Sequence, residues 1–388
     1  MNSGTSAGAA AETDELVATA RQVFADHPAE VTDGLPAALW STLTELGLVQ
    51  LSLPESAGGS GGTLADLAAL LLVAGEAAAA VPLAETELAG WLLHTAGLPV
   101  PTGPLAVASD GTLGTGTAGT GAGVAAGTGA AGSGAGVGGP AVRAGADGGY
   151  SVTGQLSRVG WAGTAARLVV LAAGPGGSDV VLSVDPTAAG ITVTPGANLA
   201  GEPRDDVLLD VRVPAEDAAT APEDTRELLV RRAALARALL LAGAAGRALA
   251  GSVRYAGERV QFGRPIGKFQ AVQQQLALAA AEVAAGRAAV DAATRIAAAN
   301  DVVGPDAGFA IAVAKARTSE AAGAVARIAH QVHGAIGFTL EHDLRLATTR
   351  LWAWREEDGS DAHWHTVIAR RVLAEGADGL WPLLTRAS

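Results

Sequence analysis

The stretch RYAGERVQFGRPIGKFQAVQ, residues Arg254–Gln273, decides the fold of this chain. A helical pattern runs into it and ends at an Arg-x-x-Phe-Gly turn, and the next helical pattern begins after Pro265 and Ile266. The turn offers a guanidinium, an aromatic face and a side-chain amide within a short distance along the chain. These groups suit a pyrophosphate and a purine, because a guanidinium binds phosphate oxygens in a fixed geometry. The stretch therefore predicts a nucleotide contact between two long helices.

A second stretch, HQVHGAIGFTLEHDL at His330–Leu344, has the same character. Gln331 lies where a helical pattern ends, and Gly334 and Gly337 follow it. Glycine has no Cβ, so a ligand can approach the backbone closely at these positions. We expect this segment to contribute to the same kind of site.

The pattern outside these stretches is helical, then β, then helical. Apolar residues recur three or four apart up to about Gly97, and Thr63 is placed to cap a helix. Short Val, Thr and Leu runs broken by Gly and Pro predict strands between Pro101 and Glu216. Long helical blocks then return: Glu227–Glu258, Val272–Asn300, Asp306–His333 and Asp361–Ala377. We expect domains at residues 1–100, 101–220 and 221–388.

One part of the middle domain has an unusual composition. Residues 111–149 are almost entirely Gly, Ala, Thr and Ser, so they offer little to bury and a high backbone entropy cost. We expect a loop-like insertion there. Gly114, Gly116 and Gly119 match a dinucleotide-binding spacing, but no strand pattern precedes them and no helix pattern follows, so composition explains the match.

Composition narrows the classes of function. The net charge of −13 argues against nucleic-acid binding, which needs clustered Lys and Arg. The absence of cysteine excludes disulfides and thiolate metal sites and fits a cytoplasmic protein. No apolar run reaches the ~18 residues of a membrane span, and the first residues do not resemble a signal peptide. We expect no metal site, since the histidines lack further ligands; they are His330, His333, His342, His363 and His365.

The two stretches resemble the acyl-CoA dehydrogenase family, whose members carry Arg-x-x-Phe-Gly-x-x-Ile-x-x-Phe-Gln and Gln-x-x-Gly-Gly-x-Gly-Phe at matching separations. The first match is nearly complete, and in the second Ala335 stands for the family's second Gly. Trp40–Gly47, Leu53–Glu55 and Gly201–Ala215 also look like family segments. The resemblance implies a mainly α protein with a small β-domain: an N-terminal helical domain, a middle β-barrel or sandwich, and a C-terminal four-helix bundle. It also implies FAD and usually a tetramer.

The resemblance places Arg259 on the FAD pyrophosphate of a neighbouring subunit, Phe262 against the adenine and Gln331 with Gly334 on the adenosine side. The alternative is structural: Arg259 pairs with Glu258 or another carboxylate, and Phe262 belongs to the core. The full set of cofactor-binding residues that the resemblance implies is Arg259, Phe262, Gln270, Gln331, Gly334, Ala335 and Ser360.

Many family members use a Glu before Gly-Thr as the base that removes the substrate α-proton. Counting from the Gly-x-Gly-Phe turn puts Asp358 in that slot, before Gly359 and Ser360, with Glu357 as the alternative base. The structural alternative is an acidic loop between helices. Some relatives carry the base on the first bundle helix, where this chain has Arg231 and Arg232 and no acid.

The middle domain departs from the family pattern. The segment that lines the flavin and the acyl group is not visible, and Trp161 lies two positions away from the family's flavin-adjacent Trp. Three readings follow. The first is an FAD-dependent dehydrogenase that forms a 2,3-double bond in an acyl-CoA and passes electrons to an electron-transfer flavoprotein. The second is a non-catalytic partner subunit that lends its FAD-binding residues to a catalytic subunit in a heterotetramer. A third reading keeps the flavin and changes the chemistry to an oxidase or a dehydrogenase of a non-CoA substrate.

Overall fold

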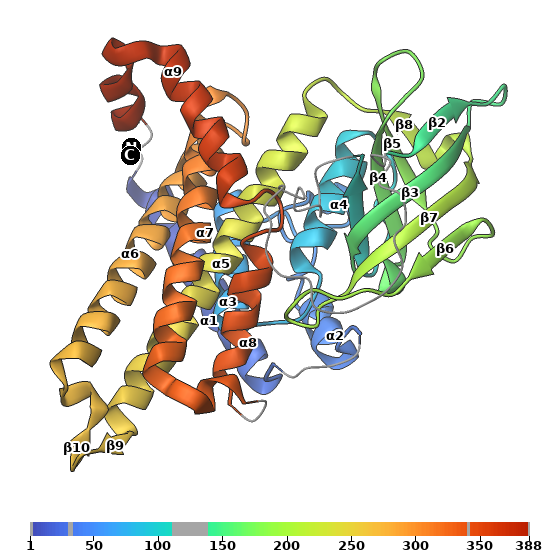
Figure 1. The fold of residues 1–388 in the computed structure, drawn as a ribbon. Coiled ribbons are helices and arrows are strands. Elements are labelled where there is room, and N and C mark those ends of the chain that lie inside the picture. Colours follow the sequence, from blue (N-terminus) through green and yellow to red (C-terminus); the bar gives the residue numbers. More distant parts are fainter. Residues whose placement is uncertain (1–2, 30–33, 111–138, 340–341, 387–388) are drawn as a thin grey trace, which may run out of the picture.

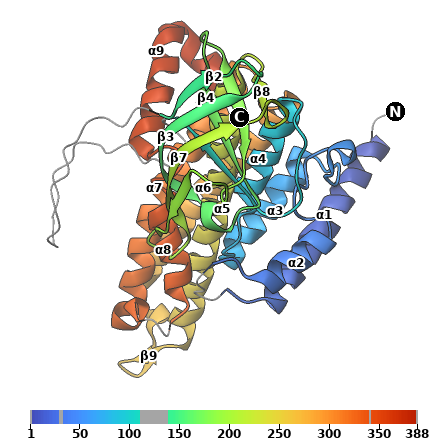
Figure 2. The same ribbon diagram turned by 90° about the vertical axis from the view of Figure 1, so that its right-hand side faces the viewer.

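A computed structural model describes residues 3–29, 34–110, 139–339 and 342–386. The first region is a group of helices: α1 (Ser3–Asp26), α2 (Ala37–Glu45), α3 (Leu64–Ala77) and α4 (Leu83–Thr95). Figure 2 shows α1 and α2 on the outside of α3. The N-terminus of α3 is capped as expected, because the Thr63 hydroxyl accepts the Asp66 N–H while the Asp66 carboxylate accepts the Thr63 N–H.

The middle domain is a sandwich of two four-stranded sheets. One sheet has the order β1 (Leu105–Ser109), β4 (Arg167–Ala173), β5 (Asp179–Val184), β8 (Ala218–Thr220). The other has the order β2 (Ala141–Ala144), β3 (Tyr150–Gly160), β7 (Arg204–Val213), β6 (Ile191–Thr194). Alternate residues of both sheets, including Val152, Leu182 and Leu209, fill the space between them. The outer face of the first sheet packs on α4, which lies between the sheets and the bundle (Figure 1).

The carboxy-terminal region is a bundle of long helices: α5 (Thr225–Glu258), α6 (Gln270–Ala299), α7 (Pro305–His333) and α9 (Asp361–Arg386), with α8 (Leu344–Trp354) between α7 and α9. A short hairpin, β9 (Val260–Gln261) and β10 (Arg264–Pro265), joins α5 to α6. The helical, β, helical order and the four-helix bundle were predicted and are confirmed. Helix α8 was not among the helices predicted from the sequence.

The expectation for residues 111–149 is wrong in its last part. Ala141–Ala144 form strand β2, which pairs with Tyr150–Thr153 of β3. Strand pairing uses backbone groups, so a run of small side chains can still form an edge strand. Residues 111–138 lie outside the described residues. Among the helices that the structure describes, none is long and apolar enough to cross a membrane.

Helices α3 and α5 meet through two glycines. A Cβ atom on Gly75 would lie 2.3 Å from the carbonyl oxygen of Leu240, and one on Gly243 would lie 2.2 Å from that of Leu72. No real side chain fits at such distances, so the two backbones touch only because both positions are glycine. This contact joins the amino-terminal helices to the bundle.

We predict that Gly243→Ala lowers the free energy of unfolding by about 2–3 kcal/mol, because the added methyl must push α3 away from α5. Gly246→Ala is the matched control on the same helix, since nothing lies within 4 Å of its added Cβ. It should raise stability by up to about 1 kcal/mol through helix propensity. Urea unfolding followed by circular dichroism measures both changes, and equal effects of the two variants would contradict this account.

Candidate functional site

The Arg-x-x-Phe-Gly segment forms the tip of the bundle. Arg259 ends α5, and Phe262 lies at the turn of the β9–β10 hairpin with a left-handed φ of 53°. The Phe262 ring is 92% exposed and meets the ring of Phe269 edge-on, with centroids 6.1 Å apart. Gln270 begins α6 directly after this turn and is also exposed. The tip therefore presents an aromatic face to its surroundings.

The second segment reaches the same end of the molecule. Gln331 lies exposed in the last turn of α7, and Gly334 and Ala335 follow in an exposed turn of 3₁₀ helix. Gly334 has a φ of 65°, and a Cβ there would meet nothing within 4 Å. The rings of Tyr255 and His333 stack at 4.4 Å, which fixes the end of α7 beside the end of α5. Figure 1 shows the hairpin and the α7–α8 corner at one end of the bundle.

The structural alternatives for Arg259 and Phe262 do not hold in this geometry. Within the described part of the chain, the Arg259 guanidinium makes no ion pair or hydrogen bond, with Glu258 or with any other residue. Phe262 belongs to none of the apolar clusters. An unpaired guanidinium, an exposed ring, two exposed amides and an accessible backbone suit contact with the pyrophosphate and adenosine of a dinucleotide.

The predicted base lies elsewhere, between the middle domain and the bundle. Asp358 has a left-handed φ of 54°, and its Oδ2 accepts an N–H from Arg237 of α5 at 2.8 Å. Glu357 is buried and receives a bidentate pair of N–H bonds from Arg204, at 3.0 and 2.7 Å. Arg237 also contacts Glu357 at 3.3 Å. Both candidate carboxylates are therefore engaged by guanidinium groups.

These contacts belong to a larger ion-pair cluster that joins three parts of the chain. Glu85 of α4 contacts Arg237 at 3.3 Å. Glu202 contacts Arg204 at 3.5 Å and Arg350 of α8 at 3.0 Å, and it accepts the indole N–H of Trp354. Asn198 donates to both Glu202 and Glu357. The charged members of this cluster are Glu85, Glu202, Arg204, Arg237, Arg350, Glu357 and Asp358.

The cluster keeps Glu357 ionised. Burial alone would raise the pKa of its carboxyl, but the charges of Arg204 and Arg237, with hydrogen bonds from Arg204 and Asn198, outweigh burial and lower the pKa to about 2. A general base works best when its pKa lies near the operating pH. Glu357 therefore has neither the proton affinity nor the access that proton abstraction needs.

Lys315 of α7 fixes the loop that carries both carboxylates. Its buried ammonium donates to the Ser319 hydroxyl and to the backbone carbonyls of Arg355 and Gly359, at 2.7–3.1 Å. Burial lowers the pKa of Lys315 to about 8. Ser360 follows this loop and accepts the backbone N–H of His363 in the first turn of α9, at 3.4 Å. In this chain Ser360 directly precedes α9 and bonds to its first turn.

The crevice beside Asp358 has little free volume. About 30 Å³ remains between Glu85, Arg158, Arg204, Arg237 and the two carboxylates. A site for a cofactor or drug-sized ligand usually has roughly 300–1,000 Å³. The residues present in the crevice therefore do not fit a flavin ring with a thioester against it, whereas those at the tip fit the nucleotide end of the cofactor.

The residues predicted from sequence thus fall into two groups. The tip group contains Arg259, Phe262, Gln270, Gln331, Gly334 and Ala335, and the crevice group contains Asp358 and Ser360. Helix α8 lies between the two groups, and its 11 residues span about 16 Å. Among the described residues, no cluster of three or more His, Cys, Asp or Glu could hold a metal ion, in the tip group, in the crevice group or elsewhere.

Sequence reasoning missed the cations of the crevice. Arg237 stands alone in the apolar run ALARALLLAGAAG, and Lys315 stands alone in FAIAVAKA. A lone charge inside an apolar helical run is a signal, because charged side chains are almost never fully buried unless paired. Neither the partner nor the site could be identified from that signal.

We predict that Glu357→Gln lowers the free energy of unfolding by about 3–5 kcal/mol, because it leaves Arg204 and Arg237 buried beside a neutral amide. Glu356→Gln is the control, since that neighbouring carboxylate is exposed and should change stability by less than about 0.5 kcal/mol. Urea unfolding measures both. If the two variants are equally stable, the cluster does not hold the domains together.

We also predict that stability falls as pH is lowered from 7 to 5. Burial lowers the pKa values of His330 and His333 below their usual value, so the unfolded chain, with a histidine pKa near ~6.5, binds protons first and gains in relative free energy. This loss of stability occurs at a higher pH than the loss caused by protonation of Glu357. The stabilisation that Glu357 provides disappears only as pH falls below about 4.5. Thermal unfolding against pH measures it. His333→Gln should flatten the profile and the exposed His94→Gln should not; a flat wild-type profile would contradict the assignment.

Comparisons with known proteins identify the family of this chain. The family model "Acyl-CoA dehydrogenase, N-terminal domain" matches residues 10–99, and "Acyl-CoA dehydrogenase, C-terminal domain" matches residues 225–373. The chain is 30% identical over 314 residues to the acyl-CoA dehydrogenase IpdE2 of Mycolicibacterium smegmatis, covering 79% of each. It is also 30% identical to the acyl-CoA dehydrogenase FadE27 of Mycobacterium tuberculosis, covering 78% of this chain and 79% of that one.

Similar solved structures cover nearly the whole chain. A variant of the Tcur3481–Tcur3483 steroid ACAD has a TM-score of 0.79 and 27% identity, covering 95% of this chain and 99% of that one. The ChsE4–ChsE5 complex from Mycobacterium tuberculosis has a TM-score of 0.79 and 26% identity, covering 94% and 97%. The fold, the two sequence segments and these matches together show that this chain belongs to the acyl-CoA dehydrogenase family.

Proposed function

We propose that this chain is a partner subunit of an acyl-CoA dehydrogenase, and that it completes the FAD site of a different, catalytic subunit. Its tip would hold the nucleotide end of the cofactor, with Arg259 on the pyrophosphate, Phe262 against the adenine and Gln331 with Gly334 at the adenosine. Gln270 and Ala335 lie at the same tip and would border the cofactor. In the catalytic subunit the flavin, when bound, would accept a hydride from the acyl-CoA.

The observation that carries the proposal is the buried ion-pair cluster. Asp358 and Glu357 are the candidates for the base that the sequence offers in the expected slot; Arg237 binds Asp358, and Arg204 binds Glu357. The space left beside them, about 30 Å³, is too small for an acyl thioester. A subunit that abstracts no proton can retain such a cluster without loss of function.

Two further observations support the proposal. The tip residues are exposed, and the Arg259 guanidinium has no partner among the described residues, which suits contact with a second chain and not a role in the core. Two of the similar structures are named as pairs of different chains, Tcur3481–Tcur3483 and ChsE4–ChsE5. An assembly of two or four subunits, joined through the carboxy-terminal bundle, is the arrangement that would bring this tip to another subunit's cofactor.

A second candidate is catalysis by this chain itself, forming a 2,3-double bond in an acyl-CoA and passing electrons to an electron-transfer flavoprotein. One observation favours it: Asp358 lies before Gly359 at the edge of the crevice and is bound by a single guanidinium. Movement of Arg237 away from Asp358 would free that carboxylate. Ser360 would then border the cofactor in this chain.

The test compares the chain alone with the assembly isolated from its native cells. We expect the purified chain to lack the flavin absorption near ~450 nm and to be inactive on a panel of acyl-CoA thioesters. The native assembly should show the flavin absorption and should turn over a thioester. In that assembly Arg259→Ala should lower FAD per assembly at least about tenfold, since hydrogen bonds to charged groups contribute about 1.5–3 kcal/mol.

The control is Arg295→Ala, which removes an exposed guanidinium from α6 far from the tip and should leave FAD content unchanged. A chain that binds FAD and turns over a thioester by itself would overturn the proposal. Loss of turnover in Asp358→Asn would then identify Asp358, and not Glu357, as the base. Unchanged FAD content in Arg259→Ala would show that the tip does not hold the cofactor.

A further inference from the structure

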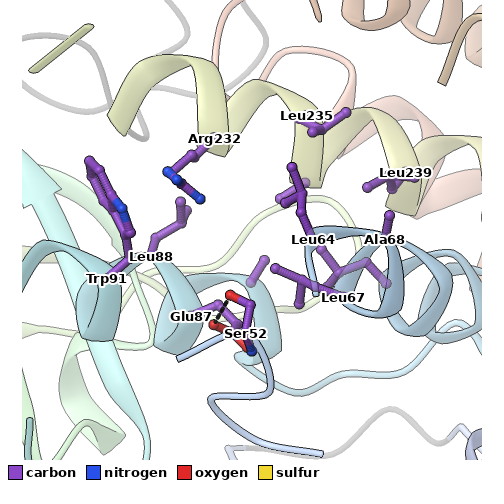
Figure 3. A pocket seen from close by; sticks show the side chains of 13 residues that line it. Ser52, Leu64, Leu67, Ala68, Glu87, Leu88, Trp91, Arg232, Leu235 and Leu239 are labelled. Atoms are coloured by element: carbon purple, nitrogen blue, oxygen red, sulfur yellow. Dashed lines mark hydrogen bonds between the residues drawn. The ribbon is translucent and has the colours of Figure 1, made fainter. Parts of the chain in front are cut away.

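The two halves of α5 present different surfaces. In the first half, large apolar side chains pack within the chain: Figure 3 shows Leu235 and Leu239 of α5 across from Leu67 and Ala68 of α3. In the second half, over residues 246–258, one side of the helix is open. That side is the floor of a groove of about 630 Å³, whose other walls are the end of α3, the end of α7 and the start of α8.

Three glycines in the second half of α5 are not explained by packing within the chain. Gly246 and Gly251 line the groove, and Gly257 lies about three turns after Gly246 on the same side of the helix. A Cβ atom on any of them would meet nothing within 4 Å among the described residues. Glycine inside a helix is less favourable than alanine, so these positions weaken α5 without a gain in packing. At Gly243, by contrast, the backbone of α3 lies directly against α5.

The groove also holds polar groups that lack partners. His333 is only 4% exposed, and its Nδ1–H donates to the Ala329 carbonyl of its own helix. The opposite ring nitrogen, Nε2, makes no hydrogen bond within the described part of the chain, and the side chain lines the groove. Arg254 and Glu258 are exposed, and neither side chain forms an ion pair or hydrogen bond with another described residue. A buried nitrogen without a donor and two free charges suit a polar partner surface.

We propose that this groove is the docking site for a helix of the catalytic subunit. The small side chains of that helix lie against Gly246, Gly251 and Gly257, so that the two backbones approach as those of α3 and α5 do. The helix also places an N–H or O–H donor at Nε2 of His333 and a carboxylate at Arg254. The glycines are therefore retained for a contact between chains.

The identity of the occupant rests on the proposed function. Glu258 directly precedes Arg259, so a chain that brings a cofactor to Arg259 lies within about one helical turn, about 5.4 Å, of the groove. One subunit can therefore hold the cofactor against the tip and fill the groove at the same time. The groove adds contact area between subunits that does not involve the cofactor.

The first test adds bulk to the glycine face. Gly251→Leu, expressed in the native cells in place of the wild-type chain, should raise the dissociation constant of the assembly at least about tenfold, because the added side chain pushes two packed backbones apart. The urea midpoint of the isolated chain should not fall, since the space beside Gly251 is open in this chain. Ala369→Leu is the control: it adds bulk at an exposed position of α9 and should leave the dissociation constant unchanged.

A charge variant tests the polar part of the surface. Arg254→Glu should raise the dissociation constant about tenfold or more, because it sets two carboxylates against each other, and it should not alter the urea midpoint. Sedimentation velocity over a dilution series measures both dissociation constants. Equal constants for the wild type and Gly251→Leu would overturn the inference. The proposed function would stand in that case, because loss of FAD in Arg259→Ala is measured separately.

Photo-crosslinking identifies the occupant. The chain has no cysteine, so Ala250→Cys carries a single benzophenone maleimide at the exposed floor of the groove. Irradiation of the assembly should join this chain to a helical peptide of the catalytic subunit, and the same label at Thr153→Cys, on the outer face of β3, should not. A product that joins two copies of this chain, or no product, would overturn the inference. An assembly without a second kind of chain would overturn the proposed function as well.

Discussion

The buried ion pairs around Glu357 are the interaction on which the arrangement of this molecule depends. Each of the three parts of the chain supplies at least one charge: Glu85 from the amino-terminal helices, Arg204 from β7 and Arg237 from α5. Removing these charges from water costs several kcal/mol per ion, so the cluster is stable only because each charge has a partner at close range. The parts must therefore stay together, because separating them would leave at least one charge unpaired in a partly buried place.

Helix α5 links this cluster to every other feature of the protein. It has 34 residues and spans about 51 Å. Arg232 and Arg237 lie in its first half, Gly243 crosses α3 near its middle, and Arg259 ends it at the tip. A rigid helix fixes the distance between the closed crevice and the exposed tip, so the tip can contact another subunit without any change in the crevice. The proposed division, with one end of α5 structural and the other beside a cofactor, is consistent with this geometry.

The sequence predicted the fold, and it did not predict the ion pairs of the crevice; the cofactor contacts of the tip stay a prediction. The helical, β, helical order depends on apolar periodicity, which can be read directly from the sequence. Phe262 and Gln331 lie in short motifs that can be recognised from their residue types and spacing. The crevice depends on Arg204 meeting Glu357 across 153 positions of the chain, and local patterns do not encode such a contact. The base position at Asp358 stays a prediction. Strand β2 was missed because Gly- and Ala-rich composition hid a ladder formed by backbone groups.

Side-chain volume explains why the crevice is filled by arginines. The chain is rich in glycine and alanine, with 4% aromatic residues, so its helices pack closely and few large side chains are available to occupy gaps. Arg204 and Arg237 fill the space between the sandwich and the bundle with their aliphatic stems, and their guanidinium groups satisfy the carboxylates around them. Replacing both by small neutral residues would remove the charge and leave a void beside an unpaired Glu357. A ligand site would not form by that change alone, because the surrounding polar groups are arranged for guanidinium and not for a flavin.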